Sequence, residues 1–193
     1  MRIVIVDDTG ARASVLEEGL RDAGYDDIHL VPPHGAFVAR IERLVPDVVL
    51  MDLGSPSRDS LEEMLIVSRA LARPIAMFVD QSDEAMIGAA IDAGISAYVV
   101  DGLRKDRVKP VLDLAIRRFN AFARMQSELQ EAKLALAERK TIDRAKAILM
   151  ETRGLTEPDA YALLRSTAMN QGRRIAEVAD ALITASSLLG GKP

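Results

Sequence analysis

The sequence predicts an α/β fold in which a doubly wound, five-stranded parallel sheet is followed by a long helix and a small three-helix domain. Short apolar runs rich in β-branched residues alternate with amphipathic stretches through residues 1–110. Residues 111–150 contain neither glycine nor proline, and two further helical patterns separated by glycines come after them. A content of 49% hydrophobic and 28% charged residues is typical of a soluble globular protein.

Five apolar runs have the length of strands, at residues 3–6, 28–31, 48–51, 75–79 and 97–100. Continuous apolar character, in place of alternation, is expected of strands buried on both faces of a parallel sheet. Helical patterns lie between the runs, at residues 11–24, 35–44, 60–71, 83–94 and 108–122. Gly24 and Gly94 stand where helices should end, and Pro46 and Pro74 precede strands. We therefore expect a series of βα units.

Three carboxylates follow the first and third predicted strands, at Asp7, Asp8 and Asp52. The carboxyl ends of parallel strands are where such sheets bind ligands. Converging carboxylates repel one another, and a hard cation such as Mg²⁺ relieves that repulsion. With the charge neutralised, one carboxylate can attack a phosphoryl group. Single aspartates at strand ends are often helix caps or turn residues, but three together favour a site.

These residues resemble a response-regulator receiver domain of flavodoxin-like fold. VDD at 6–8 matches the acidic pair of that family, MDL at 51–53 its phosphoacceptor, and Pro56 and Asp59 its loop after the third strand. The resemblance covers residues 1–110, with the last receiver helix continuing to about residue 122. It implies that Asp52 is the phosphoacceptor, that Asp8 and Asp52 bind Mg²⁺ directly, and that Asp7 acts through water.

Two positions depart from the receiver pattern, which has Thr or Ser after the fourth strand and Lys after the fifth. Val79 and Asp101 stand there in this chain. Valine cannot donate a hydroxyl hydrogen bond, and aspartate replaces a cation by a like charge. Two alternatives are open: Ser82 or Lys105 could supply the missing groups, or the alignment could be shifted by a residue or two. We expect that the pocket can still bind Mg²⁺, whereas a protein partner on the receiver surface, more than phosphorylation, controls activity.

The long helix carries a heptad-like pattern. Apolar residues are spaced 3, 4, 3 and 4 apart, at Phe122, Met125, Leu129, Ala132 and Leu136. This spacing predicts a coiled coil and hence a homodimer through a linker at residues 111–138. The run spans only about two heptads, so an amphipathic helix that packs within one chain is the alternative.

Basic residues gather further along this helix, at Arg139, Lys140, Arg144 and Lys146. Residues 1–110 carry 12 Lys and Arg against 19 Asp and Glu, whereas residues 111–193 carry 13 against 10. A solvated helix face and a phosphate-binding face both fit this pattern.

Turn signals divide the remaining chain into helices. Gly154 ends the long helix, Thr156 caps the next with Pro158 in its first turn, and Gly172 ends that helix before a third pattern at residues 175–183. Apolar spacing gives each of the three helices one inward face.

The segments ERKTIDRAKAILM, GLTEPDAYALLRSTAM and RRIAEVADALI resemble the ANTAR domain, the RNA-binding module of AmiR- and NasR-type antitermination regulators, over residues 136–193. The resemblance implies binding to hairpins of a nascent leader transcript. The order of the domains is most similar to regulators of the NasT type, which implies nitrate or nitrite assimilation and either a NasS-like sensor protein that sequesters the regulator or a histidine kinase. Our candidates for RNA contact are Lys140, Arg144 and Lys146, with Arg139, Arg165, Arg173 and Arg174 at the periphery.

The main alternative is a DNA-binding two-component regulator activated by phosphorylation at Asp52. No helix shows a compact Arg, Asn and Gln set suited to major-groove base edges. We expect no enzyme, because no catalytic His, Ser or Cys constellation is evident. We expect a cytoplasmic protein for three reasons. The sequence has no cysteine and no signal peptide, and no apolar run approaches the roughly 20 residues that span a bilayer.

Overall fold

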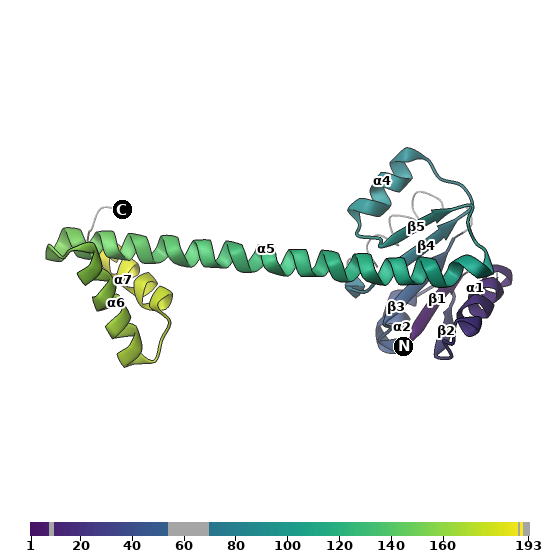
Figure 1. Ribbon diagram of the computed structural model, residues 1–193, viewed down its shortest axis with the longest axis horizontal. Coiled ribbons are helices and arrows are strands. Elements are labelled where there is room, and N and C mark those ends of the chain that lie inside the picture. Colours follow the sequence, from purple (N-terminus) through teal and green to yellow (C-terminus); the bar gives the residue numbers. More distant parts are fainter. Residues whose placement is uncertain (8–9, 54–69, 189, 191–193) are drawn as a thin grey trace. The chain divides into compact units, whose positions relative to one another are not determined.

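The computed structural model describes residues 1–7, 10–53, 70–188 and 190, and it divides into two compact units, Met1–Arg124 and Met125–Pro193 (Figure 1). The predicted helix at residues 60–71 lies outside the described residues except for Ala70 and Leu71, which are helical. Pro56 and Asp59 also lie outside them.

The first unit contains the predicted parallel sheet. Its strands are β1 (Ile3–Asp7), β2 (Ile28–Val31), β3 (Val48–Asp52), β4 (Ile75–Val79) and β5 (Ala97–Val100). They pair in the order β2-β1-β3-β4-β5, and every pairing is parallel. β3 and β4 are buried along their whole length, as their continuous apolar sequences require. The predicted α/β fold with five parallel strands is confirmed.

Helices cover both faces of the sheet. On one face, α1 (Ala11–Asp22) and the first turns of α5 (Lys105–Arg153) pack through Leu16, Leu20, Val108 and Leu112. On the other face, α2 (Phe37–Leu44) and α4 (Glu84–Asp92) contribute residues to a second apolar cluster. Two cores separated by one sheet are the doubly wound arrangement that the alternating pattern predicts.

Gly19 lets α1 pack closely against the start of α5. A Cβ atom at Gly19 would lie 2.8 Å from Val108 Cγ2 and 2.9 Å from the carbonyl oxygen of Lys105. Backbone cannot yield as a flexible side chain can, so a larger residue requires a shift of one helix. This contact fixes the beginning of α5 within the first unit.

α5 is a single helix of 49 residues that contains Pro110 near its start. It begins at Lys105, three residues before the predicted start, and it includes the heptad-like segment. The large side chains of that segment are exposed, with exposed fractions of 59% at Phe122, 66% at Met125 and 49% at Leu129. The coiled coil predicted from the spacing of these residues stays a prediction.

The second unit is a three-helix domain formed by the last turns of α5, α6 (Glu157–Gln171) and α7 (Ile175–Leu188). Its buried residues include four alanines, so that the helices approach closely, together with Leu149, Leu164 and Val178. Thr156 caps α6 by accepting a hydrogen bond from the backbone N–H of Asp159, and Gly172 ends α6 with a φ of 61°. Among the described residues, no helix has the length and apolar content needed to cross a membrane.

Candidate functional site

The acidic pocket forms where β1 and β3 end side by side. Asp7 and Asp52 are register partners on these two strands. Asp52 is fully buried, and Asp7 accepts a hydrogen bond of 2.6 Å from the backbone N–H of Gly10, which precedes α1 in a left-handed conformation. The third predicted carboxylate, Asp8, lies outside the described residues. The parallel topology thus brings together the two described carboxylates of the predicted site.

A guanidinium group that the sequence did not single out enters this pocket. Arg12, in the first turn of α1, donates from Nε to Asp52 Oδ2 at 2.7 Å and from Nη1 to Asp80 Oδ1. Asp80 directly follows β4, so Arg12 joins the ends of two neighbouring strands. Burial disfavours the charge of Arg12, but the hydrogen bonds and attraction to Asp52 and Asp80 outweigh it and raise the pKa of the guanidinium.

The two altered switch positions lie at the same edge of the sheet. Val79 is the last residue of β4, and Asp101 directly follows β5 and donates its backbone N–H to the carbonyl oxygen of Val79 at 2.9 Å. Asp101 is exposed and adopts a left-handed conformation with a φ of 46°. Neither residue supplies the hydroxyl or ammonium group of the receiver pattern.

The two substitutes considered for those groups have other partners. Lys105 forms ion pairs with Glu18 at 3.3 Å and Asp22 at 2.9 Å, which join the start of α5 to α1. Ser82 Oγ lies 2.8 Å from the hydroxyl oxygen of Tyr98. Arg12 is therefore the cation that the described residues bring to Asp52.

Receiver domains commonly bind Mg²⁺ in this acidic pocket, and the carboxylates of Asp7 and Asp52 have the oxygen donors that this ion prefers. The charge of this pocket differs from that of the carboxylate cluster predicted from the sequence, however, because Arg12 places a cation against Asp52. Among the residues that the structure describes, no three acidic, histidine or cysteine side chains are arranged to hold a metal ion. Arg12 thus holds one of the two carboxylate oxygens of Asp52, and Asp8, the other direct ligand that the resemblance implies, lies outside the described residues, so the Mg²⁺ site stays a prediction.

In the second unit, the predicted RNA-contact residues on α5 separate into two stripes. Arg139, Asp143 and Lys146 share one stripe, on which Asp143 lies 4.0 Å from Arg139 and 2.7 Å from Lys146. Lys140 and Arg144 are four residues apart on another stripe, and both are exposed. The basic helix therefore presents two surfaces of different character.

Lys146 lies on α5 and pairs with acidic residues of α5 and α6. Its side chain is only 15% exposed and forms ion pairs of 2.7 Å with both Asp143 and Glu157, which tie α5 to the first turn of α6. The hydrogen bonds to Asp143 and then Glu157 raise the pKa of Lys146, and the same contact lowers the pKa of Asp143. These pairings give Lys146 a part in the packing of α5 against α6, and its contact with RNA stays a prediction.

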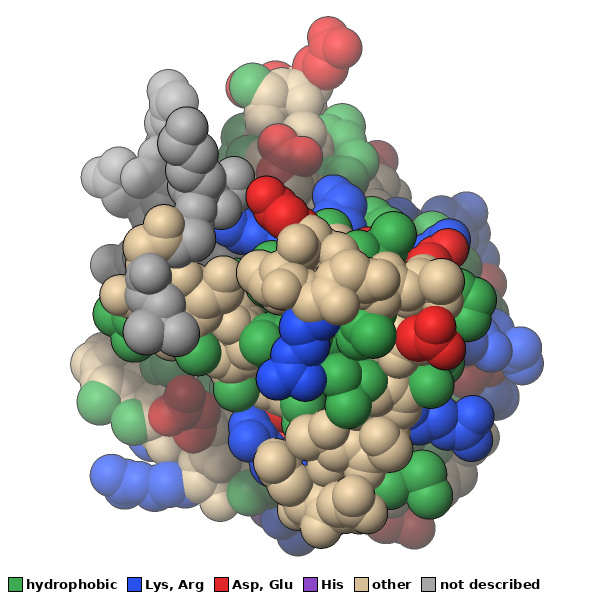
Figure 2. All heavy atoms as spheres, turned by 90° about the vertical axis from the view of Figure 1, so that its left-hand side faces the viewer, with side chains coloured by type: hydrophobic (Ala, Val, Ile, Leu, Met, Phe, Trp, Pro, Cys, Tyr) green, Lys and Arg blue, Asp and Glu red, His purple; other side chains and the backbone are tan. Residues whose placement is uncertain are grey.

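Three of the four arginines predicted at the periphery, Arg165, Arg173 and Arg174, line a hollow of about 580 Å³ between α5, α6 and α7, together with apolar residues. Arg174 forms ion pairs with Glu138 at 2.7 Å and Glu177 at 3.1 Å, and the latter contact lowers the pKa of Glu177. Among the described residues, no acidic partner lies within ion-pair distance of Arg165, which also lines the hollow. On the face that Figure 2 shows, basic and acidic side chains are interspersed, with hydrophobic side chains between them.

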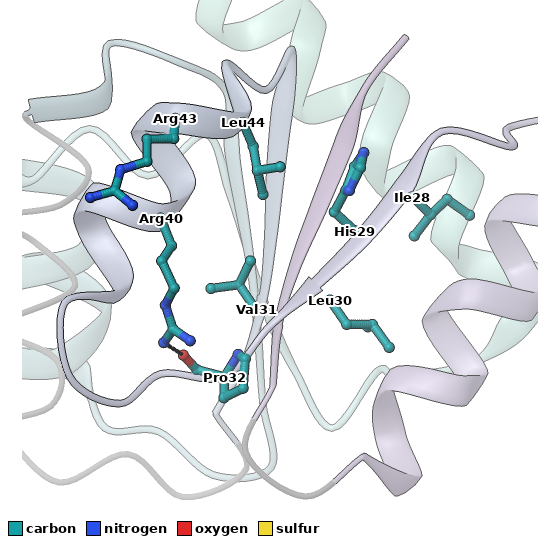
Figure 3. Close-up of a pocket in the computed structure, with 8 residues that line it drawn as sticks. All are labelled: Ile28, His29, Leu30, Val31, Pro32, Arg40, Arg43 and Leu44. Atoms are coloured by element: carbon teal, nitrogen blue, oxygen red, sulfur yellow. Dashed lines mark hydrogen bonds between the residues drawn. The ribbon is translucent and has the colours of Figure 1, made fainter.

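A second hollow, of about 530 Å³, lies beside the edge strand β2 and is lined in part by α2 (Figure 3). Arg40 crosses it and donates to the carbonyl oxygens of Pro32 at 2.7 Å and His34 at 2.6 Å. None of the predicted site residues lines this hollow. Arg40 there holds the connection between β2 and α2.

Comparison with protein families decides the class of the chain. The model of the response regulator receiver domain matches residues 3–113, and that of the ANTAR domain matches residues 130–183. The chain is a response regulator with an ANTAR domain. Both resemblances in the sequence are thereby confirmed, and so is the expectation of a regulator in place of an enzyme, because the family is non-enzymatic.

Two relatives match different lengths of this regulator. The transcriptional regulatory protein PdtaR of Mycobacterium tuberculosis is 29% identical over 182 residues, which are 94% of this chain and 89% of that protein. The nitrate regulatory protein of Klebsiella oxytoca is 31% identical over 128 residues, which are 66% of this chain but only 31% of that protein. The first similarity extends through both domains.

Solved structures support the fold of the first unit. A CheY-like response regulator receiver domain from Methanospirillum hungatei is similar with a TM-score of 0.52 and 20% identity, over 62% of this chain and 97% of that one.

The site that the structure shows includes Arg12 and Asp80, which were not predicted from the sequence. The loss of a cation after β5 was the one signal that a compensating cation should be sought near the acidic pair.

Proposed function

We propose that this regulator acts in transcription antitermination by binding hairpins of a nascent leader RNA through its C-terminal helices. The observation that carries the proposal is the ANTAR match over residues 130–183, which coincides with a three-helix domain that has its own core. Hairpin loops expose base edges and faces that a regular RNA helix hides, and small helical surfaces can reach them.

Lys140 and Arg144 are the phosphate contacts in this proposal. Both are exposed on α5, and no acidic side chain of the described residues lies within ion-pair distance of either one. Two like charges four residues apart repel each other by roughly 0.2–0.5 kcal/mol in a helix. A bound polyanion neutralises both charges and so removes that repulsion. The placement of Lys140 beside Arg144 therefore favours RNA binding, although it does not stabilise the fold. Arg139, Arg173 and Arg174 are peripheral phosphate contacts, and Lys146 positions α5 against α6.

A stripe on α6 offers contacts for unpaired bases. Tyr161, Arg165 and Met169 follow one another at intervals of four residues and therefore share one side of the helix. Tyr161 is 42% exposed and Met169 is 72% exposed. An aromatic ring and a guanidinium plane can both stack on splayed bases. We propose that this stripe reads the loop while Lys140 and Arg144 hold the backbone.

The linker segment makes the active form a homodimer in this proposal. The exposed side chains of Phe122, Met125 and Leu129 recur at a/d spacing, and pairing with a second copy would bury them. Two ANTAR domains held together would bind two hairpins with a raised effective concentration.

The receiver passes on a signal from a protein partner in this proposal. Val79 and Asp101 remove two phosphoryl-contacting groups, and Arg12 occupies the side of Asp52 that faces Asp80. The Klebsiella oxytoca relative is named a nitrate regulatory protein, which supports a role in nitrate regulation. The resemblance to NasT-type regulators extends this proposal to nitrate or nitrite assimilation, with a NasS-like sensor protein as the sequestering partner. A histidine kinase is the partner to be expected if Asp52 is phosphorylated and treatment with a phosphodonor strengthens binding.

The test compares binding of the full chain to leader RNA hairpins and to promoter duplex DNA at one salt concentration. We expect preference for the hairpins; preference for the duplex would favour the DNA-binding alternative. Lys140→Ala and Arg144→Ala should each weaken binding to all hairpins similarly and reduce the magnitude of the salt slope by about one. Lys109→Ala, which removes a surface lysine of the receiver paired with Asp113, is the matched control.

A third variant separates base reading from phosphate contact. Tyr161→Ala should lower affinity for hairpins and reduce discrimination between loop sequences, with little change in salt slope, because stacking is worth roughly 1–3 kcal/mol per base and carries no charge. Equal binding by the wild type and by all three variants would contradict the proposed interface, although the family assignment would stand.

A further inference from the structure

The side chain of Arg12 bridges two acidic groups at the centre of the receiver pocket. Asp52 is 0% exposed, Arg12 is 27% exposed and Asp80 is 49% exposed, so the bridge runs from the interior to the surface. Its Nε donates to Asp52 at 2.7 Å, while Nη1 donates to Asp80. The two acids follow adjacent parallel strands, β3 and β4, and Arg12 comes from the helix after β1.

The chemistry of Asp52 explains why the bridge matters. A buried carboxylate without a nearby cation is strongly disfavoured, so a pocket with several carboxylates needs a positive charge from somewhere. A divalent ion is one source and a side chain is another. Lys105 is held by Glu18 and Asp22, and the position after β5 carries Asp101. Arg12 supplies the charge from within the chain.

A guanidinium and a divalent ion compete for the same oxygens. Mg²⁺ requires oxygen ligands at about 2.0–2.1 Å in octahedral geometry. Arg12 already holds Oδ2 of Asp52, so an ion bound to this carboxylate would either displace the guanidinium or lie close to its positive charge, which repels it. The guanidinium is planar, always charged, and here has two acidic partners, so displacing it breaks both contacts.

We propose that Arg12 is the resident counter-ion of the phosphoacceptor pocket and that it excludes Mg²⁺ from Asp52, so that the receiver holds one state with or without this ion. The inference extends the proposed partner-controlled receiver and does not depend on RNA binding. A guanidinium is charged at any pH at which proteins fold, and the contacts with Asp52 and Asp80 raise the pKa of Arg12 further.

The experiment is a titration of the full chain with Mg²⁺, followed by calorimetry, and with Mn²⁺, followed by electron paramagnetic resonance. The wild type should show no saturable binding below about 10 mM, and Arg12→Gln should bind at least about tenfold more tightly, a gain of about 1.4 kcal/mol. Adding Asp52→Asn to Arg12→Gln should abolish the gain, which assigns it to the pocket. Arg21→Gln is the control, since Arg21 lies on the same helix, is exposed, and among the described residues pairs only with Glu17.

Two results would overturn the inference. One is saturable binding of Mg²⁺ by the wild type with a Kd below about 10 mM, which can be measured whether or not any variant folds. The other is a folded Arg12→Gln variant, as judged by circular dichroism, that binds the ion no better than the wild type does. RNA affinity, measured in parallel on the same samples, tells a failure of this inference from a failure of the proposed function.

Discussion

Replacing Gly19 by alanine tests the packing that fixes the start of α5. Alanine is favoured over glycine in a helix interior by about 1 kcal/mol. At Gly19, however, the new Cβ would lie 2.8 Å from Val108 Cγ2 and 2.9 Å from the carbonyl oxygen of Lys105. Overpacking of this kind costs roughly 1–3 kcal/mol. Gly19→Ala should therefore leave the receiver unit destabilised by about 1 kcal/mol.

Gly88→Ala is the matched substitution, because Gly88 also lies inside a helix and a Cβ atom there would meet nothing within 4 Å. It should stabilise the receiver unit by about 1 kcal/mol. Helix propensity cancels between the two variants, so the difference in their free energies of unfolding isolates the packing term of roughly 1–3 kcal/mol. Hydrogen exchange of the amides of β1 and β3 reports this free energy for the receiver alone. Equal stabilisation by both substitutions would refute the reasoning.

Three further predictions concern α5 and α6. Thr156→Ala should cost about 1 kcal/mol and accelerate hydrogen exchange at the start of α6, whereas Thr156→Ser should retain the cap; an unchanged exchange rate in the alanine variant would count against the cap. The pKa of Asp143 is lowered from 3.8 by its hydrogen bond to Lys146, so its contribution to stability is present above pH 3.8 and is lost as the pH falls further. In thermal melts, Asp143→Asn should consequently show a shallower loss of Tm below that pH than the wild type shows. Leu129→Glu should shift analytical ultracentrifugation profiles toward monomer with unchanged helicity, and association equal to that of the wild type would exclude the linker as the dimer contact.

The elements of the fold follow from short-range patterns. The predicted strands at residues 28–31, 75–79 and 97–100 coincide with β2, β4 and β5, and the remaining two each extend one residue further, to Asp7 and Asp52. Periodicity and capping depend on neighbours within a few positions, which is why the ends of α6 at Thr156 and Gly172 were also predictable. The long helix begins at Lys105, three residues before the predicted start, and it contains Pro110.

The sequence by itself determined the class of each unit, the meeting of Asp7 with Asp52, and the exposure of Lys140 and Arg144, because strand topology and helical periodicity set all of these. The tertiary structure alone decided how the remaining charges are used. Arg12 reaches Asp52 across 40 positions of the chain, and Lys146 turns toward Glu157 on the next helix. Charges on separate elements find one another through the packing of those elements and the rotamers it permits, and linear spacing does not encode that choice. Tertiary packing thus put a cation of the chain's own at Asp52 and paired Lys146, one of the predicted RNA contacts, with Asp143 and Glu157.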